Sequence, residues 1–264
     1  MIISSTANPR MKHIRALATR QEREKAQQFF IEGIRIVGEA VQMGADIETL
    51  IYAPSLLKSH FALELVHEQQ ERGISCLEVS SEVFRSLSTK DGPQGIGAVV
   101  HQRWEMLEQV TPQQNDFWVA LDAAQDPGNI GTILRTSDAV GCSGLILLDH
   151  SADPYDSGAL RASMGAVFSQ RLIKATFDDF ILWKQRHMLS VIGTSDAAST
   201  DYRTTTYHRP VVLLMGSERE GLSPFQQSIC DLMIQIPMVG RSDSLNLAVA
   251  TGIVLYEIFY QTRT

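Results

Sequence analysis

Apolar residues recur along this chain with the spacing of alternating helices and strands. In the first hundred residues, helical patterns lie between short runs rich in β-branched and aromatic residues, which is typical of an α/β sandwich. The predicted elements, in chain order, are a polar, basic helix at 11–28, a strand at FFIEG, a helix at 34–43, a strand at IETLIYA, a helix at 55–72, a strand at ISCLEV, a helix at 81–87 and a strand at GIGAVV.

The second half has longer, continuous apolar runs, which suit parallel strands that helices cover on both faces. The segment between the halves, 101–116, is polar and contains Thr111-Pro112, so it is typical of a linker. We therefore expect one domain over 1–105, a linker over 106–116 and a second domain over 117–264. The strand-like runs of that second domain are FWVALD, GLILLD, LSVIGT, VVLLMG and DLMIQIP.

A final helix is predicted from about 244 to 261. Its apolar residues fall along one stripe, which would pack against the sheet or a partner. The predicted stripe contains Leu245, Ala248, Val249, Gly252, Leu255 and Phe259.

Composition narrows the class of protein. With 264 residues, 44% of them hydrophobic and 20% charged, the chain is long enough to bury a sizeable core. Its apolar runs are too short to span a membrane, and its first residues do not resemble a signal peptide. Cys76, Cys142 and Cys230 are too scattered for a disulfide framework or a zinc site. We expect a cytoplasmic protein without a metal.

Net charge is −7, which taken alone disfavours nucleic acid as a partner. The charge is unevenly distributed, because residues 1–35 carry seven basic against three acidic side chains and are locally +4. Such a segment is compatible with a solvated helix face, and equally with a local RNA-binding footprint. The sequence leaves both interpretations open.

Three glycine- and asparagine-bearing segments follow apolar runs in the second half: DPGNIGTILRTSDA (126–139), LLMGSEREGL (213–222) and IPMVGRSDSLNLAVA (236–250). In the first, Arg135 and Asp138 are spaced for an exposed ion pair, yet an arginine there could also lie near the strand ends, where α/β sheets bind ligands.

The other two segments also have two interpretations. Gly216 and Gly221 permit close approach of backbone to a ligand, while Glu218 and Glu220 disfavour a phosphate. Ser244 occupies an N-cap position, and the free amides of that helix start could receive a carboxylate or a polar cofactor. A P-loop and a strand-linked GxGxxG are both missing from the sequence, which disfavours nucleotide hydrolysis and dinucleotide binding.

In this order and spacing, the three segments resemble the motifs of the SpoU branch of the SPOUT RNA methyltransferases. Asn129 and Arg135 match the first motif, and Gly216, Glu218, Gly221 and Leu222 match the second. Ile236-Pro237-Met238 and Ser244-Leu245-Asn246 match the third, and LRASMGAVF (160–168) resembles the segment between motifs one and two. The stretches ISSTANPRMKHIRAL, FFIEGIRIVGEA and TKDGPQGIGAV resemble the family's ribosomal-protein-like substrate-binding domain.

The resemblance implies transfer of a methyl group from S-adenosylmethionine to a ribose 2′-hydroxyl of RNA, without a metal. It implies a mostly parallel α/β domain with a deep trefoil knot, one of the rare exceptions to unknotted topology, beside a smaller N-terminal α/β RNA-binding domain. Expected cofactor contacts are Gly216, Ile236, Leu245, Leu214, Thr194 and Met238.

The catalytic residues implied are Arg135, Asn129, Glu218, Ser244 and Asn246. The family assigns Arg135 the role of base, although an arginine that stays protonated is better suited to clamp an RNA phosphate and orient the hydroxyl. The resemblance further implies a homodimer acting on ribosomal RNA, because the appended domain resembles an RNA-binding ribosomal protein. Transfer RNA as substrate, and a non-catalytic RNA-binding or assembly factor with the same fold, are the alternatives.

Overall fold

A computed structural model describes residues 2–89 and 91–263 of the chain. Lys90, within TKDGPQGIGAV, and the outer ends of the two predicted domains lie outside the described residues. The described chain forms two compact units, one reaching to Gln102 and including Tyr155–Leu160, the other comprising Arg103–Pro154 and the chain from Arg161 onward. Within the described residues, no helix is long and apolar enough to cross a membrane.

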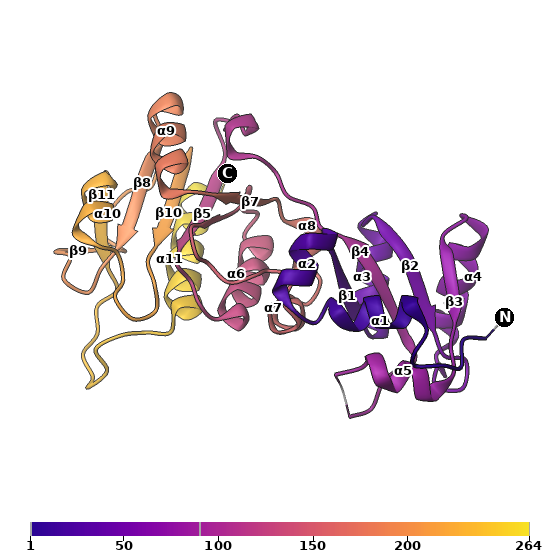
Figure 1. Cartoon of the computed structure of the whole chain (residues 1–264). Helices are drawn as coiled ribbons and strands as arrows, with labels where there is room; N and C mark the ends of the chain where they lie inside the picture. The colour runs from indigo at the N-terminus through magenta and orange to yellow at the C-terminus, as the bar shows by residue number, and fades with distance from the viewer. Residues whose placement is uncertain (1, 90, 264) are drawn as a thin grey trace. The chain divides into compact units, whose positions relative to one another are not determined.

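The first unit is built on a four-stranded sheet with the order β1-β4-β2-β3, drawn from indigo to magenta in Figure 1. Strand β4 is antiparallel to both β1 and β2, whereas β2 and β3 are parallel. Its elements are α1 (Pro9–Ala16), α2 (Arg20–Ala26), β1 (Gln28–Glu32), α3 (Ile34–Gln42), β2 (Ile47–Tyr52), α4 (His60–Glu71), β3 (Ser75–Glu78), α5 (Ser81–Leu87) and β4 (Ile96–His101).

The single helix predicted over 11–28 is instead two helices, α1 and α2. The break falls where the Thr19 side chain accepts a hydrogen bond from Glu22 N and starts α2. Arg23 explains why the break is stable, because its buried guanidinium donates to the carbonyls of Leu17 and Ala18 between the helices. The helix predicted from 55 likewise begins only at His60, after a Ser59 cap. In both places the polar residues that the pattern includes in one continuous helix instead cap and connect shorter helices.

The second unit contains a seven-stranded sheet with the order β7-β6-β5-β10-β8-β11-β9, and every pairing in it is parallel. The fold is therefore α/β with a parallel sheet, as predicted from the continuous apolar runs. Its elements are η1 (Leu107–Gln109), β5 (Phe117–Asp122), α6 (Pro127–Ala139), β6 (Gly144–Leu148), α7 (Ser157–Ser163), whose residues are divided between the two units, α8 (Ala166–Ser169), β7 (Leu172–Ala175), α9 (Phe177–His187), β8 (Ser190–Thr194), β9 (Thr200–Asp201), β10 (Val211–Met215), α10 (Pro224–Ile229), β11 (Leu232–Gln235) and α11 (Leu247–Thr262).

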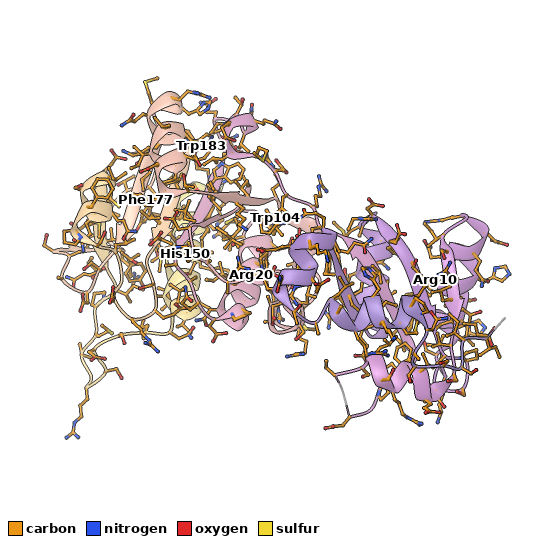
Figure 2. The ribbon with its side chains drawn as sticks, viewed as in Figure 1. Arg10, Arg20, Trp104, His150, Phe177 and Trp183 are labelled. Atoms are coloured by element: carbon orange, nitrogen blue, oxygen red, sulfur yellow. The ribbon has the colours of Figure 1, made fainter. Side chains whose placement is uncertain are left out.

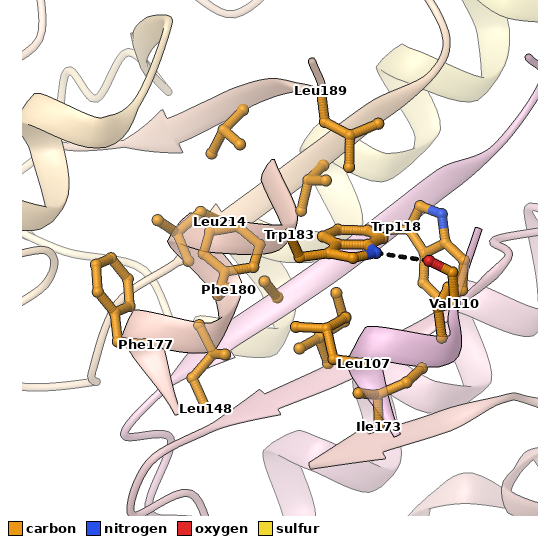
Figure 3. Packing of buried hydrophobic residues seen from close by; sticks show 14 of the residues in the cluster. Leu107, Val110, Trp118, Leu148, Ile173, Phe177, Phe180, Trp183, Leu189 and Leu214 are labelled. Carbon is orange, nitrogen blue, oxygen red and sulfur yellow. Dashed lines mark hydrogen bonds between the residues drawn. The ribbon is translucent and has the colours of Figure 1, made fainter. Parts of the chain in front are cut away.

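One core of this unit contains two tryptophans and two phenylalanines among aliphatic residues. Trp118 and Trp183 meet edge to face with ring centroids 5.9 Å apart, and Trp183 Nε1 donates to Val110 O over 2.8 Å (Figure 3). Leu107 and Val110 belong to the same buried cluster. The segment 106–116, expected to be a linker, thus contributes core residues to the second unit.

Helix α11 lies beside α6 (Figure 1). The predicted stripe on α11 is partly wrong, since Val249 is exposed and Leu245 precedes the helix. The face that is actually buried starts one residue after the N-cap, because Asn246 rather than Ser244 caps the helix. It consists of Leu247, Ala248, Thr251, Val254, Leu255 and Ile258.

Candidate active site

The loop after β10, residues 216–222, is a tight turn that requires glycine at two positions. A Cβ on Gly216 would lie 2.1 Å from the Gly221 carbonyl carbon, and Gly221 has a φ of 65°. Ser217 and Gly221 form an isolated antiparallel bridge, with Gly221 N donating to Ser217 O over 3.0 Å. The loop therefore presents main chain at the carboxyl edge of the sheet, where ligands bind in α/β folds.

Glu218 fastens this loop to the connection between β5 and α6. Its carboxylate accepts hydrogen bonds from Gln125 N over 3.0 Å, Asp126 N over 3.2 Å and Asn129 Nδ2 over 3.1 Å. Partial burial by itself would raise the pKa of Glu218, but these hydrogen bonds together outweigh that effect and lower the pKa below its ordinary value. The group is consequently a carboxylate with its acceptor capacity used for holding two loops together.

Asn129 links Glu218 to the start of α11. Its Oδ1 accepts from Asn246 Nδ2 over 2.9 Å, while its Nδ2 donates to Glu218. The Asn246 Oδ1 in turn caps α11 by accepting from Ala248 N over 2.9 Å and from Val249 N over 3.2 Å. One chain of side chains, Glu218 to Asn129 to Asn246, therefore joins the three motif segments.

A cavity of about 430 Å³ opens beside this chain of hydrogen bonds. Five of the predicted cofactor residues line it, namely Thr194, Gly216, Ile236, Met238 and Leu245, together with the predicted catalytic residues Glu218 and Ser244. Leu214 is absent from its lining, and its side chain belongs instead to the buried core cluster around Trp118 and Trp183. The third motif and the loop after β10 thus face one cavity.

Besides Glu218, three acidic side chains line the cavity. Asp196 follows the end of β8, Glu220 lies in the 216–222 loop, and Asp243 precedes Ser244. Among the described residues of the lining, Arg219 alone carries a positive charge. Glu220 and Asp243 belong to the second and third motif segments. No sequence pattern marks Asp196, because its position depends on how β8 pairs in the sheet.

A second, shallower hollow of about 710 Å³ lies between α6 and α11. Asn129 and Asn246 line it, and Asn129 is hydrogen-bonded to Glu218, which lines the first cavity. Its remaining lining residues are Gly128, Thr132, Thr136, Ala162, Ala248, Val249, Gly252, Ile253 and Tyr256.

Arg135 lies apart from the other predicted catalytic residues. It is exposed on α6, six residues after Asn129 and thus about 9 Å farther along the helix axis, and it lines neither space. Its side chain has no hydrogen-bond or ion-pair partner among the residues described here. The structure shows no ion pair between Arg135 and Asp138, and Asp138 accepts a hydrogen bond from Ser169 Oγ over 2.6 Å. The guanidinium is therefore free to bind an external anion.

Comparison with known proteins identifies the class to which this fold and site belong. Residues 116–256, more than half of the chain, match the SpoU rRNA Methylase family, and residues 8–98 match the MRM3-like substrate binding domain. The chain belongs to the SpoU rRNA methylase family, and it is an RNA methyltransferase with an N-terminal substrate-binding domain.

Individual relatives cover nearly the whole chain. It is 30% identical to the 23S rRNA (uridine(2479)-2′-O)-methyltransferase of Streptomyces viridochromogenes, over 97% of this chain and 91% of that protein. It is 29% identical to the 23S rRNA (guanosine(2553)-2′-O)-methyltransferase of Bacillus subtilis, over 97% and 98%. The crystal structure of AdoMet-bound rRNA methyltransferase from Sinorhizobium meliloti superposes with a TM-score of 0.89 at 39% identity, covering 98% of this chain and 97% of that one.

Proposed function

We propose that this protein transfers the methyl group of S-adenosylmethionine to a ribose 2′-hydroxyl of ribosomal RNA. The observation that carries the proposal is the hydrogen-bonded chain from Glu218 through Asn129 to Asn246, which joins the three motif segments beside one cavity. Membership of the SpoU family supports it, as do two relatives named as 23S rRNA 2′-O-methyltransferases. With such a substrate, we propose that the protein acts in the cytoplasm.

The residues around the cavity fit this cofactor. Its volume of about 430 Å³ lies within the range of about 300–1,000 Å³ common for small-molecule sites. Apolar Ile236, Met238 and Leu245 suit an adenine ring, and the bare backbone of Gly216 allows close approach. Leu214 supports this wall from within β10. Family membership leads us to propose also that the main chain here is threaded as a deep trefoil knot.

Charge in the cavity favours the methyl donor over a neutral ligand. S-adenosylmethionine, when bound, supplies a methyl group on a positively charged sulfur. The carboxylates of Asp196, Glu220 and Asp243 complement a cation, and they would repel a phosphate-bearing cofactor.

Arg135 acts in this proposal on the RNA. A guanidinium stays protonated in proteins, so it is poorly suited to remove the proton from a ribose hydroxyl. Its fork of donors matches a phosphate, and the exposed side chain has no competing carboxylate at Asp138. Arg135 would therefore hold a backbone phosphate and so align the hydroxyl, which governs the rate of an in-line displacement.

Glu218, Asn129, Ser244 and Asn246 position the reacting groups. The bonds of Glu218 all run to the β5–α6 connection and Asn129, so it holds two loops in register. Asn129 and Asn246 line the hollow between α6 and α11, and their amides would orient a ribose there. Ser244 would complete the cavity wall.

We propose that the protein is a homodimer formed through the face of α11 that carries Val249, Tyr256 and Tyr260. These side chains are 52%, 53% and 64% exposed, and Val249 and Tyr256 border the hollow between α6 and α11. A second copy seated there would bury them and would bring its own residues to Asn129 and Asn246. Sedimentation of Tyr256→Glu as a monomer, with the wild type as a dimer, would support this assembly, and a monomeric wild type would refute it.

RNA binding by the first unit rests on fewer charges than the sequence suggested. Arg23 is buried, Arg20 is paired with Glu24, and Lys25 is paired with Glu22. Arg10 and Lys12 on α1 have no side-chain partner within the described part of the chain. Figure 2 shows Arg10 on α1 and Arg20 on α2. We propose that Arg10 and Lys12 contact the phosphates of the RNA.

The decisive experiment has two stages. Calorimetry with S-adenosylmethionine tests the cavity, and radiolabelled methyl transfer to ribosomal RNA, with a 2′-deoxy nucleotide at the modified position as control, tests the reaction. Binding followed by transfer that the 2′-deoxy substitution abolishes is the expected result. Methyl transfer to tRNA but not to ribosomal RNA would show that tRNA is the substrate. Folded protein that binds RNA but not S-adenosylmethionine would show that the protein is a non-catalytic RNA-binding factor.

A further inference from the structure

Asp122, the last residue of β5, is a buried carboxylate outside the motifs and outside the lining of the cofactor cavity. It is 8% exposed, and its Oδ2 accepts a hydrogen bond from Gln226 Nε2 over 2.6 Å. Burial raises the pKa of Asp122, and the hydrogen bond from Gln226 opposes that rise. Burying a carboxylate is costly unless the group is paired or hydrogen-bonded, so the bond from Gln226 offsets part of the cost.

Gln226 uses both ends of its amide. While Nε2 donates to Asp122, Oε1 accepts from Ser223 N over 2.7 Å, and Ser223 Oγ accepts from Gln226 N over 3.3 Å. This reciprocal capping box starts α10. The amide therefore ties the first turn of α10 to the end of β5.

The first turn of α10 follows directly on the loop that forms one wall of the cofactor cavity. Leu222, the last residue of that loop, is buried and lines the cavity, and its carbonyl accepts from Gln227 Nε2 over 2.8 Å. The loop is thus held at two points by one connection of the chain. Glu218 binds the amides of Gln125 and Asp126, and Gln226 binds Asp122, only three residues before Gln125.

We propose that Asp122 and Gln226 are positioning residues that fix the second anchor of the 216–222 loop and so set the affinity for S-adenosylmethionine. The proposal rests on the proposed function. Neither side chain lines the cofactor cavity. Asp122 acts through Gln226, Gln226 acts through the start of α10, and the loop between the two anchors keeps Gly216 and Glu218 in place.

The direction of the hydrogen bond provides the test. Gln226→Glu keeps the acceptor oxygen needed for the capping box but turns the donor facing Asp122 into an oxygen, so two carboxyl groups meet. Asp122→Asn keeps an acceptor oxygen for Gln226. The double variant Asp122→Asn with Gln226→Glu reverses donor and acceptor and restores the bond. Ser228→Ala is the matched control, because it removes a side-chain bond of α10 to its own Phe225 carbonyl.

Affinity for S-adenosylmethionine is measured by calorimetry on folded protein, well below the melting temperature of each variant. We expect Gln226→Glu to raise Kd about tenfold, as for loss of a hydrogen bond to a charged group. Asp122→Asn, Ser228→Ala and the double variant should stay within about threefold of wild type. Hydrogen exchange in residues 216–222 should accelerate only in Gln226→Glu.

The outcomes separate this proposal from the one on which it rests. Wild-type protein that binds S-adenosylmethionine, with Gln226→Glu binding equally well, would refute the positioning role and leave the proposed function intact. Failure of the double variant to recover affinity would also refute it. Wild-type protein that does not bind S-adenosylmethionine would overturn both proposals. If Gln226→Glu does not fold, Gln226→Ala and Asp122→Ala must weaken binding by the same factor, alone and combined, or the proposal fails.

Discussion

Asn246 Nδ2 donates to Asn129 Oδ1 over 2.9 Å and so joins two residues that are 117 positions apart. The same Asn246 side chain caps α11 through Ala248 N and Val249 N. One residue consequently fixes where the last helix starts and where the first motif meets the third.

Replacement of Asn246 should separate these two roles. Asn246→Ala loses the cap and should lower the free energy of unfolding by about 1 kcal/mol. Asn246→Asp keeps a capping oxygen but loses the donor to Asn129, so stability should stay near wild type while methyl transfer falls about 100-fold. Urea unfolding and single-turnover transfer measure the two effects. Ser244→Ala is the control, and a stability loss equal to that of Asn246→Ala would contradict the assignment of the cap.

Gly216→Ala should close the cofactor cavity. The added Cβ would lie 2.1 Å from the Gly221 carbonyl carbon, so the loop must shift, at a cost of about 1–3 kcal/mol. We expect calorimetry to show cofactor binding at least about tenfold weaker, a factor of ten being about 1.4 kcal/mol. Gly240→Ala is the matched variant, since its Cβ would meet nothing within 4 Å. Unchanged affinity in Gly216→Ala would show that the loop does not form the cofactor wall.

Arg135→Ala should reduce methyl transfer without changing the melting temperature or the affinity for S-adenosylmethionine. The side chain is exposed and has no partner within the described residues, so nothing in the fold depends on it. Arg135→Lys retains a charge for a phosphate but not the fork, and we expect it to recover part of the lost activity. Equal loss in both variants, with a shifted pH profile, would point to proton transfer rather than phosphate binding.

The double variant Arg10→Gln and Lys12→Gln should weaken RNA binding and make it less dependent on salt. Two lost phosphate contacts reduce the slope of log K against log salt by about 1.4 to 1.8. Cofactor affinity should not change. The control is Lys58→Gln with Arg72→Gln, two exposed charges of the same unit, and equal losses in both pairs would mean a general charge effect. Charge substitution is preferable to deletion of residues 1–28, because Met11, Ile14 and Leu17 belong to the core.

The ion pair between Glu105 and Arg171 should stabilise the second unit at neutral pH, and this contribution should be lost in acid. Two-pronged hydrogen bonding from Arg171, at 3.0 Å and 2.7 Å, holds the pKa of Glu105 below its ordinary value. Because the folded pKa is depressed, the pair stabilises the protein above the unfolded pKa of about 4.3, and this stability is lost as pH falls through the folded pKa. Glu105→Gln should therefore be less stable than wild type by about 1 kcal/mol at pH 7. Unfolding curves whose difference does not shrink in acid would contradict this.

Local patterns predicted most elements, but not their ends. Strands β5, β6, β8, β10 and β11 coincide with the five apolar runs, since strands covered on both faces must be apolar throughout. Short or edge elements gave too little signal, so β7 and β9 were not predicted. Predicted helix boundaries were wrong where a polar side chain could lie either within a helix or at its cap. Thr19 divides the first predicted helix, and Asn246 replaces Ser244 as the cap of the last.

By itself, the sequence determined the parallel α/β architecture and the three motifs whose order defines the family, because apolar periodicity and glycine requirements are local properties of the chain. Only the tertiary structure decided how these motifs meet. Glu218 and Asn129 come together because the neighbouring parallel strands β10 and β5 end at the same edge of the sheet, and Asn246 reaches Asn129 because α11 packs against α6. The anchor from Asp122 to Gln226, 104 positions apart, depends on the same pairing. Contacts between distant residues follow from strand order, which local patterns do not encode.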